Sequence, residues 1–312
     1  MKKNSVRTHM FLVATLLAVG ALIFPYYSLA GDKMAPEEIV AKHLESIGAS
    51  ETLASVHSRI AAGTVVATLQ SPGTAKFEGG QVIMASDGIK NMLKIGFGQE
   101  SSSKGSSYQE NFGFNGKDLT VGFVRPGVRG YLADFLLTHP NIVKDGLVGG
   151  TLSDAWPLLT SSQKKPKLEY HGIKKIAGKS LYELKYIPRG SSDLEISLFF
   201  DTETFHHVRS EYTRVISAGL GTGVIGTGRV TSPSQSGAID GSGQQRTTRY
   251  RMVEEFSDFR KEGGLTLPHV YKIGLQLDTR AGMLIVDWDF TLTDFSFNQP
   301  IPPATFNVNP KP

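Results

Sequence analysis

The sequence predicts a mainly β fold built on a large antiparallel sheet. From Ser58 onward, apolar and polar residues alternate with a period of two, as in strands that bury one face. Polar turns such as Ser86-Asp87-Gly88 and Asn115-Gly116 separate the runs, so consecutive strands are joined by short connections and favour an antiparallel meander over a parallel sheet. About twelve strands are expected: Arg59–Gln70, Ala75–Ala85, Ile89–Gly98, Tyr108–Asn115, Asp118–Val124, Lys167–Ile176, Ser180–Ile187, Leu194–Phe200, Phe205–Ile216, Thr247–Phe259, Leu267–Leu277 and Met283–Phe297.

The first 30 residues have the order of a secretory signal peptide. Basic residues come first, the apolar run Met10–Phe24 follows, and Ser28-Leu29-Ala30 supplies the small residues of a cleavage site. We therefore expect cleavage after Ala30 and a periplasmic or secreted mature chain; the alternative is an uncleaved N-terminal anchor. No later stretch is apolar enough to span a bilayer.

Charge and cysteine content exclude several functions. Without Lys2, Lys3 and Arg7, the 33 Lys and Arg residues become 30 against 29 Asp and Glu, a net charge of +1 that does not indicate nucleic-acid binding. The chain contains no cysteine, which excludes disulfides, a thiolate metal site, a cysteine nucleophile and a lipid-modified N-terminal cysteine. No cofactor is predicted. The mature length fits one large β domain or two small ones, and we expect a single domain over 31–312.

Helical patterns stand at two places. The first begins at Pro36, where a proline suits the first turn, and Gly48 can close the helix. A short segment, Ser50–His57, follows it. The second is a mid-chain helical insert, residues 128–159. In this insert a helix is expected to end before Pro140, and Thr151-x-x-Asp154 resembles a capping box.

Two glycine-containing stretches imitate nucleotide-binding motifs. Residues 219–229, GLGTGVIGTGR, contain the Gly-x-Gly-x-x-Gly pattern of a dinucleotide-binding motif. The sequence that follows is rich in Gly, Ser and Pro and cannot begin the helix that such a motif requires. We expect 217–245 to be a flexible Gly/Ser-rich loop. Residues 172–180, GIKKIAGKS, lack P-loop spacing and lead into a strand, so we expect a hairpin turn at Ala177-Gly178-Lys179.

No catalytic motif is found. Asp287 and Asp289 share one face of a strand whose other face is apolar, which places them on the solvated side. Glu254 and Glu255 point to opposite faces, as do His206 and His207. A catalytic triad whose members lie far apart in the sequence remains an alternative, because such residues would come together only in the folded protein.

The insert admits two interpretations. Its apolar residues complete an ordinary core, or they form a lid over a cavity that accepts an apolar ligand. In the second case we expect Phe135 and Trp156 to be buried above a cavity. The candidate ligand-binding residues are Leu132, Phe135, Leu136, Trp156 and Leu159.

Several stretches, in order, resemble the LolA-like periplasmic lipoprotein-carrier superfamily. They are EEIVAKHLESIGASETLASVHSRIAAGTV, GLVGGTLSDAWPLL, LFFDTETFHHVRSEY, EEFSDFRKEGGLTLPHVYKI and FNQPIPPATFNVNP. The resemblance implies an incomplete antiparallel barrel of about eleven strands whose concave, apolar face is covered by helices. It also implies acyl chains as ligands and an arginine that holds the lid. No arginine matches that position; Arg125 lies just before the insert, and Arg129 lies near its start.

We therefore expect an exported, non-enzymatic protein that binds a lipid or an acylated lipoprotein in a half-barrel cavity, as a carrier in the cell envelope. The alternatives are an interaction module of an envelope complex, with a filled core and no ligand, and a hydrolase on the same scaffold. An apolar cavity favours the carrier, a polar cluster inside it favours the hydrolase, and no cavity favours the module.

Overall fold

The computed structural model describes residues 34–71, 73–98, 108–124, 128–160, 166–190, 192–216, 248–279 and 282–308. The expected signal peptide and the fingerprint within 217–245 lie outside these residues. Within the described residues, no helix has the length and apolar character needed to cross a membrane.

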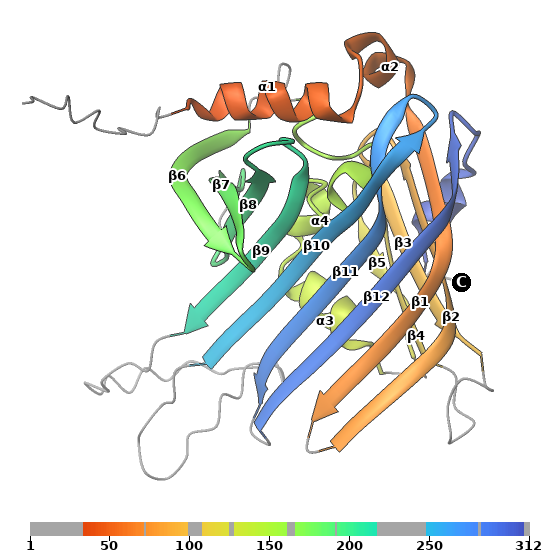
Figure 1. Cartoon of the computed structure of the whole chain (residues 1–312). Helices are drawn as coiled ribbons and strands as arrows, with labels where there is room; N and C mark the ends of the chain where they lie inside the picture. Colours follow the sequence, from red (N-terminus) through yellow and green to blue (C-terminus); the bar gives the residue numbers. More distant parts are fainter. Residues whose placement is uncertain are drawn as a thin grey trace, which may run out of the picture. The chain divides into compact units, whose positions relative to one another are not determined.

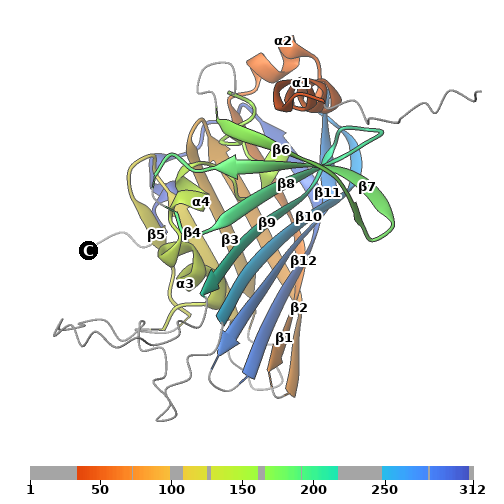
Figure 2. The same cartoon turned by 90° about the vertical axis from the view of Figure 1, so that its left-hand side faces the viewer.

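In the described residues, twelve strands form one antiparallel sheet that curves around the helices without closing into a barrel (Figures 1 and 2). The expectation of a mainly β, open half-barrel with helical cover is confirmed, with twelve strands in place of about eleven. The strands are β1 (Ser58–Ser71), β2 (Gly73–Asp87), β3 (Lys90–Phe97), β4 (Tyr108–Phe114), β5 (Leu119–Val121), β6 (Lys167–Ile176), β7 (Lys179–Ile187), β8 (Glu195–Asp201), β9 (His207–Ile216), β10 (Thr248–Glu262), β11 (Leu265–Thr279) and β12 (Gly282–Phe297).

The sheet consists of two meanders joined through the first and last strands. Its order is β5-β4-β3-β2-β1-β12-β11-β10-β9-β8-β7-β6, so β1 pairs with β12. The expectation of one meander in chain order is therefore incomplete. The insert lies between β5 and β6 in the sequence, and these two strands are the edges of the sheet. The chain leaves one edge, crosses the open side and returns at the other.

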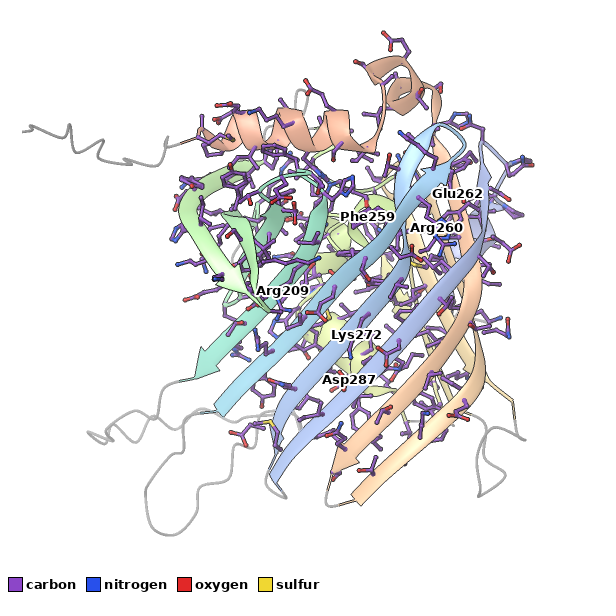
Figure 3. All side chains as sticks on the ribbon, viewed as in Figure 1. Arg209, Phe259, Arg260, Glu262, Lys272 and Asp287 are labelled. Carbon is purple, nitrogen blue, oxygen red and sulfur yellow. The ribbon has the colours of Figure 1, made fainter. Side chains whose placement is uncertain are left out.

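The alternation of β12 shows why these residues form a curved sheet with one apolar face. Trp288 and Phe290 are buried on its concave face, together with the other inward residues of this strand, whereas Asp287 and Asp289 point outward. Figure 3 shows Asp287, Lys272 and Arg209 on the outer, convex face. Lys272 forms an ion pair with Asp289 at 3.3 Å, so charged groups occupy the convex face as the pattern predicts.

A bulge at Gly63 shapes the seam between β1 and β12. The register shifts between Ala62 and Gly63, and a β-carbon at Gly63 would overlap the carbonyl oxygen of Thr291. Glycine is therefore required here by the close approach of the neighbouring backbone. The expected hairpin turn is confirmed as well, because Ala177 and Gly178 both have positive φ between β6 and β7.

The N-terminal helices lie at one end of the half-barrel (Figures 1 and 2). Helix α1 (Pro36–Ile47) has a proline in its first turn and ends before Gly48, as predicted. It buries an apolar face made of Ile39, Val40 and Ile47. The shorter α2 (Ser50–Ser55) follows at once.

The insert lies on the concave side of the sheet, where it forms α3 (Tyr131–Thr138), α4 (Asn141–Lys144) and the 3-10 turn η2 (Gly150–Leu152) (Figure 2). Helix α3 ends before Pro140, as expected. The capping box expected at Thr151 and Asp154 is wrong. Thr151 lies inside η2, and the Asp154 carboxylate accepts a hydrogen bond from Gly88 N–H at 3.1 Å in the β2–β3 turn. Contact with the sheet, and Pro157, prevent a regular helix here.

Candidate functional site

The five candidate residues gather in one apolar core beneath the insert. Leu132, Phe135, Leu136 and Trp156 are buried, and Leu159 is half-buried against the same core. The expectation that Phe135 and Trp156 are buried is confirmed. Their contact with a ligand remains a prediction.

We expected a cavity under Phe135 and Trp156. Two hollows stand out in the described part of the chain, and none of the five candidate residues lines either of them. One has a volume of about 10 Å³ and lies between β2, β3 and the insert, against Asn91 and Leu152. Such a volume accepts one water at most. The large side chains of the insert pack against those of the sheet in one buried core.

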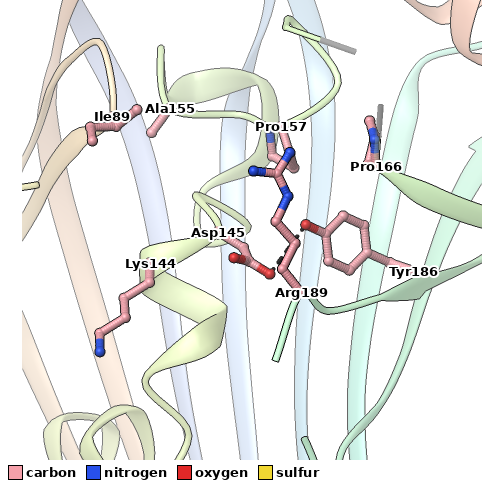
Figure 4. Close-up of a pocket in the computed structure, with 8 residues that line it drawn as sticks. All are labelled: Ile89, Lys144, Asp145, Ala155, Pro157, Pro166, Tyr186 and Arg189. Atoms are coloured by element: carbon pink, nitrogen blue, oxygen red, sulfur yellow. Dashed lines mark hydrogen bonds between the residues drawn. The ribbon is translucent and has the colours of Figure 1, made fainter. Parts of the chain in front are cut away.

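The other hollow lies beside the end of α4 and has a volume of about 60 Å³ (Figure 4). Lys144, Asp145, Tyr186 and Arg189 contribute polar groups to it, and the Tyr186 hydroxyl donates to the Asp145 carboxylate at 3.2 Å. Its size suits a few waters and excludes an acyl chain. Neither of these two hollows has room for a lipid.

Three charged side chains from the concave face hold the insert in place. The first is Glu110 on β4, whose carboxylate accepts hydrogen bonds from Leu132 N–H at 3.4 Å and Ala133 N–H at 3.2 Å. Helix α3 has no capping side chain of its own at Gly130, where a β-carbon would overlap the Glu110 carboxylate. A residue of the sheet thus caps a helix of the insert, satisfying N–H groups that have no partner within the helix.

Burial raises the pKa of Glu110 to about 7, although hydrogen bonds from the Tyr108 hydroxyl and from the first turn of α3 act in the opposite direction. The Tyr108 hydroxyl donates to Glu110 at 2.9 Å and accepts from Trp288 Nε1 at 3.2 Å. Removal from water disfavours the charged carboxylate more strongly than these donors favour it.

The second is Glu254 on β10. Its carboxylate accepts from Gly149 N–H at 2.8 Å, from the Tyr212 hydroxyl at 2.6 Å and from the Tyr271 hydroxyl. Glu254 is fully buried, and burial raises its pKa. The backbone just before η2 is thereby tied to the centre of the sheet.

The third is Arg59 on β1, whose side chain is 2% exposed. Its Nη1 donates to the Thr151 carbonyl oxygen at 2.6 Å. This contact joins the start of β1 to η2 of the insert. Arg129 instead forms an ion pair with Asp134 at 3.6 Å and is partly exposed, and Arg125 lies outside the described residues.

A fourth contact links the insert to α1. Trp156 Nε1 donates to His43 Nε2 at 3.3 Å, and His43 Nδ1 donates to the Phe205 carbonyl oxygen at 3.0 Å. Trp156 also stacks on His207, with ring centroids 4.6 Å apart. Burial lowers the pKa of His43 to about 4, so this imidazole is neutral and can accept from the indole.

Sequence reasoning missed Arg59 and Glu110 and considered Glu254 for catalysis alone, although the alternation of inward and outward residues along each strand contains the signal. Glu254 stands between Met252 and Phe256 in the inward phase of β10, and both neighbours are buried. Glu110 likewise shares the inward phase with Phe112. A charged residue in an apolar phase predicts a buried partner, but the sequence does not show that the partner is the backbone of the insert.

The groups considered for catalysis do not converge in the described residues. Asp287 and Asp289 face outward, Glu254 is buried while Glu255 is exposed, and His207 points inward. In the same part of the chain, no cluster of three or more His, Asp or Glu residues could hold a metal ion.

Comparisons with known proteins found similar structures but no similar sequences. No family model and no curated protein matches the chain. A LolA superfamily protein from Nitrosomonas europaea matches with 12% identity and a TM-score of 0.41, covering 88% of this chain and 98% of that one. A domain assigned to outer membrane lipoprotein sorting, from Vibrio parahaemolyticus, matches with 9% identity and a TM-score of 0.40, over 86% and 95%. The MucA/MucB complex of Pseudomonas aeruginosa matches with 12% identity and a TM-score of 0.21, over 81% and 94%.

The chain thus has a structural likeness to a LolA superfamily protein, the superfamily that the sequence resembles. The overlays are loose, with TM-scores of 0.41 and below. What this chain binds has to be inferred from its own side chains.

Proposed function

We propose that this chain is an exported carrier of an apolar ligand, a lipid or an acylated protein, and that the ligand occupies the concave face when the insert withdraws. One observation carries the proposal. The apolar face of the sheet is covered by a separate segment that joins the two free edges, contains little regular structure and is anchored by a few polar contacts.

The polar contacts suit a cover that moves. A hydrogen bond to a charged group contributes about 1.5–3 kcal/mol when formed, but water can replace it once the segment is exposed. Apolar surface uncovered by the insert would be covered again by acyl chains, at roughly 0.8 kcal/mol per buried methylene. The ligand therefore offsets the main cost of opening.

The packing of the insert against the concave face favours a second candidate, an interaction module that binds no ligand. In that case the insert is permanent core, and partners bind elsewhere on the surface. The two candidates differ in one measurable respect, which is whether an apolar molecule displaces the insert.

The chain offers a matched pair of reporters for this test, because its two tryptophans are both fully buried, Trp156 in the insert and Trp288 in the sheet. Trp288→Phe leaves only the insert reporter, and Trp156→Phe leaves only the sheet reporter. Each variant is titrated with a long-chain fatty acid and with phospholipid vesicles. For a carrier, Trp156 emission shifts to longer wavelength at saturation, while Trp288 emission changes less.

Hydrogen exchange supplies the second readout. Amides of residues 130–159 should lose protection when the ligand binds, whereas those of β1 and β12 keep theirs. Binding with unchanged protection of the insert would contradict displacement, and no binding to either lipid would leave the interaction module as the better function. Native mass spectrometry of protein from a bacterial envelope then identifies any lipid that copurifies.

A further inference from the structure

Arg59 keeps two of its nitrogen groups without a partner in the described residues, although its side chain is almost wholly buried. Nη1 donates to the Thr151 carbonyl oxygen, whereas Nε and Nη2 make no hydrogen bond. The carboxylate of Asp154 balances the charge, but its oxygen lies 3.9 Å from Nε, too far for a hydrogen bond. A buried donor without a partner is costly, so this arrangement needs an explanation.

Both groups that face the guanidinium belong to the insert. Thr151 and Asp154 leave together when this segment withdraws, and Arg59 then remains on the apolar concave face as a cation without a counterion. Burial lowers the pKa of Arg59 to about 10, with Asp154 acting in the opposite direction, so the group is charged at neutral pH. The open conformation consequently favours a ligand that brings a negative charge to this point.

The geometry of the free groups indicates which anion fits. Nε and Nη2 lie along one edge of the planar guanidinium, where their N–H bonds run parallel. This edge matches two oxygens of a carboxylate or a phosphate in a bidentate pair. An uncharged ester offers a single carbonyl oxygen and no charge.

We propose that Arg59 is the head-group site for an anionic amphiphile, whose carboxylate or phosphate binds the Nε–Nη2 edge while its tail lies along the concave face. This rests on the proposed function and adds the chemistry of the ligand's polar end. The ligand replaces both contacts of the insert at Arg59, the hydrogen bond of Thr151 and the charge of Asp154. Binding and displacement of the insert are thereby coupled at one residue.

The test compares two fluorescent probes that differ only in their head group, an anthroyloxy-labelled stearic acid and its methyl ester. Arg59→Met removes the charge and the Nε–Nη2 edge while keeping a side chain of similar length, and Arg59→Lys retains the charge alone. The control is Arg260→Gln, because Arg260 is an exposed arginine on the outer face (Figure 3). We expect the wild-type protein and the control to bind the acid about tenfold or more tightly than the ester. Arg59→Met should bring this ratio close to one, and Arg59→Lys should give an intermediate value.

The ratio separates head-group recognition from easier opening of the insert, because a loosened insert strengthens the binding of both probes alike. Asp154→Asn provides that comparison: it weakens the closed conformation, and the ratio should stay at the wild-type value. It also serves as the folded reference if Arg59→Met does not fold, in which case Arg59→Lys alone must lower the ratio. Displacement by stearate and by a lysophosphatidate of the same chain length shows which of the two anions fits better.

Equal affinity of the wild-type protein for acid and ester would overturn the head-group site while leaving the carrier in place. A tenfold preference that survives in every folded Arg59 variant would also overturn it. Failure of both probes to bind would overturn the carrier and the head-group site together.

Discussion

Replacing Glu110 with glutamine should make the stability of the protein less dependent on pH. The pKa of Glu110 is raised from its ordinary value of 4.5 to about 7 in the folded state, with burial as the main cause. Below pH 4.5 the carboxyl is protonated in both the folded and unfolded states. As the pH rises further, the unfolded state ionises first, and the free energy of unfolding falls until the pH passes about 7.

The size of the effect follows from the pKa difference. One pKa unit corresponds to about 1.4 kcal/mol, so ionisation of Glu110 removes roughly 3 kcal/mol from the free energy of unfolding between these two pH values. Glutamine adds no charge and keeps one oxygen, which can accept from the Tyr108 hydroxyl and Leu132 N–H, whereas Ala133 N–H, which donates to the other oxygen, loses its acceptor. We expect the variant to lie within about 1 kcal/mol of the wild-type protein at pH 5 and to be more stable by about 2 kcal/mol at pH 8.

Urea unfolding followed by circular dichroism at pH 5 and pH 8 measures both quantities. Glu38→Gln is the control, because Glu38 is an exposed residue of α1 paired with Lys42 at 3.1 Å, and its effect should be small and similar at both pH values. Hydrogen exchange of α3 amides, compared between variants at each pH, shows whether ionisation opens the insert before the sheet unfolds. An unchanged stability difference between wild type and Glu110→Gln at the two pH values would refute the reasoning.

Three further perturbations test other parts of the structure. Phe135→Asp places a carboxylate in the apolar core, so it should destabilise the packing of the insert by at least about 3 kcal/mol. Hydrogen exchange of the insert should increase, while the strand signal in circular dichroism persists. Loss of the strand signal would contradict an insert that separates from the sheet. Asp287→Asn combined with Asp289→Asn should change the free energy of unfolding by less than about 1 kcal/mol in chemical denaturation, since both residues lie on the convex face; a larger loss would place them in the core. Gly63→Ala should destabilise the protein by more than about 2 kcal/mol, because the new β-carbon meets the Thr291 carbonyl oxygen. The control Gly96→Ala, at a strand glycine with open space around it, should cost less than about 1 kcal/mol. Equal shifts of the melting temperature in the two variants would contradict the close approach of the backbones at Gly63.

The sequence predicts elements better than it predicts their partners. The alternation around Trp288 identifies β12 and its buried face, and Pro36 and Gly48 mark both ends of α1, because these signals depend on neighbouring residues only. The pairing of β1 with β12 joins segments that are far apart in the chain and have no local signal. The failed capping box at Thr151 has the same cause, since contacts with the sheet outweigh local propensity there.

The candidate site divides in the same way. Phe135 could be recognised as buried because helical spacing places it on an apolar face, whereas Trp156 lies outside any helix and is buried by its contacts with His43 and His207. How the side chains of several strands fit together beneath them is contained in no local pattern. Arg59 is the clearest case, because it follows Ser58 at the start of an ordinary strand, and its role arises only from the segment that folds over it.

The seam between the first and last strands also constrains how the chain can fold. Arg59 pairs with Phe297, so β1 has no neighbour on that side until the final strand has been made. A nascent or truncated chain ending before Gly282 would present the 14-residue β1 and the 15-residue β11 as open edges, which are templates for pairing with other molecules. Such long-range pairing also makes folding slow, because the chain loses the entropy of closing a large loop before the strand pairing stabilises it. Residues 282–297 therefore determine when the wall of the half-barrel can form.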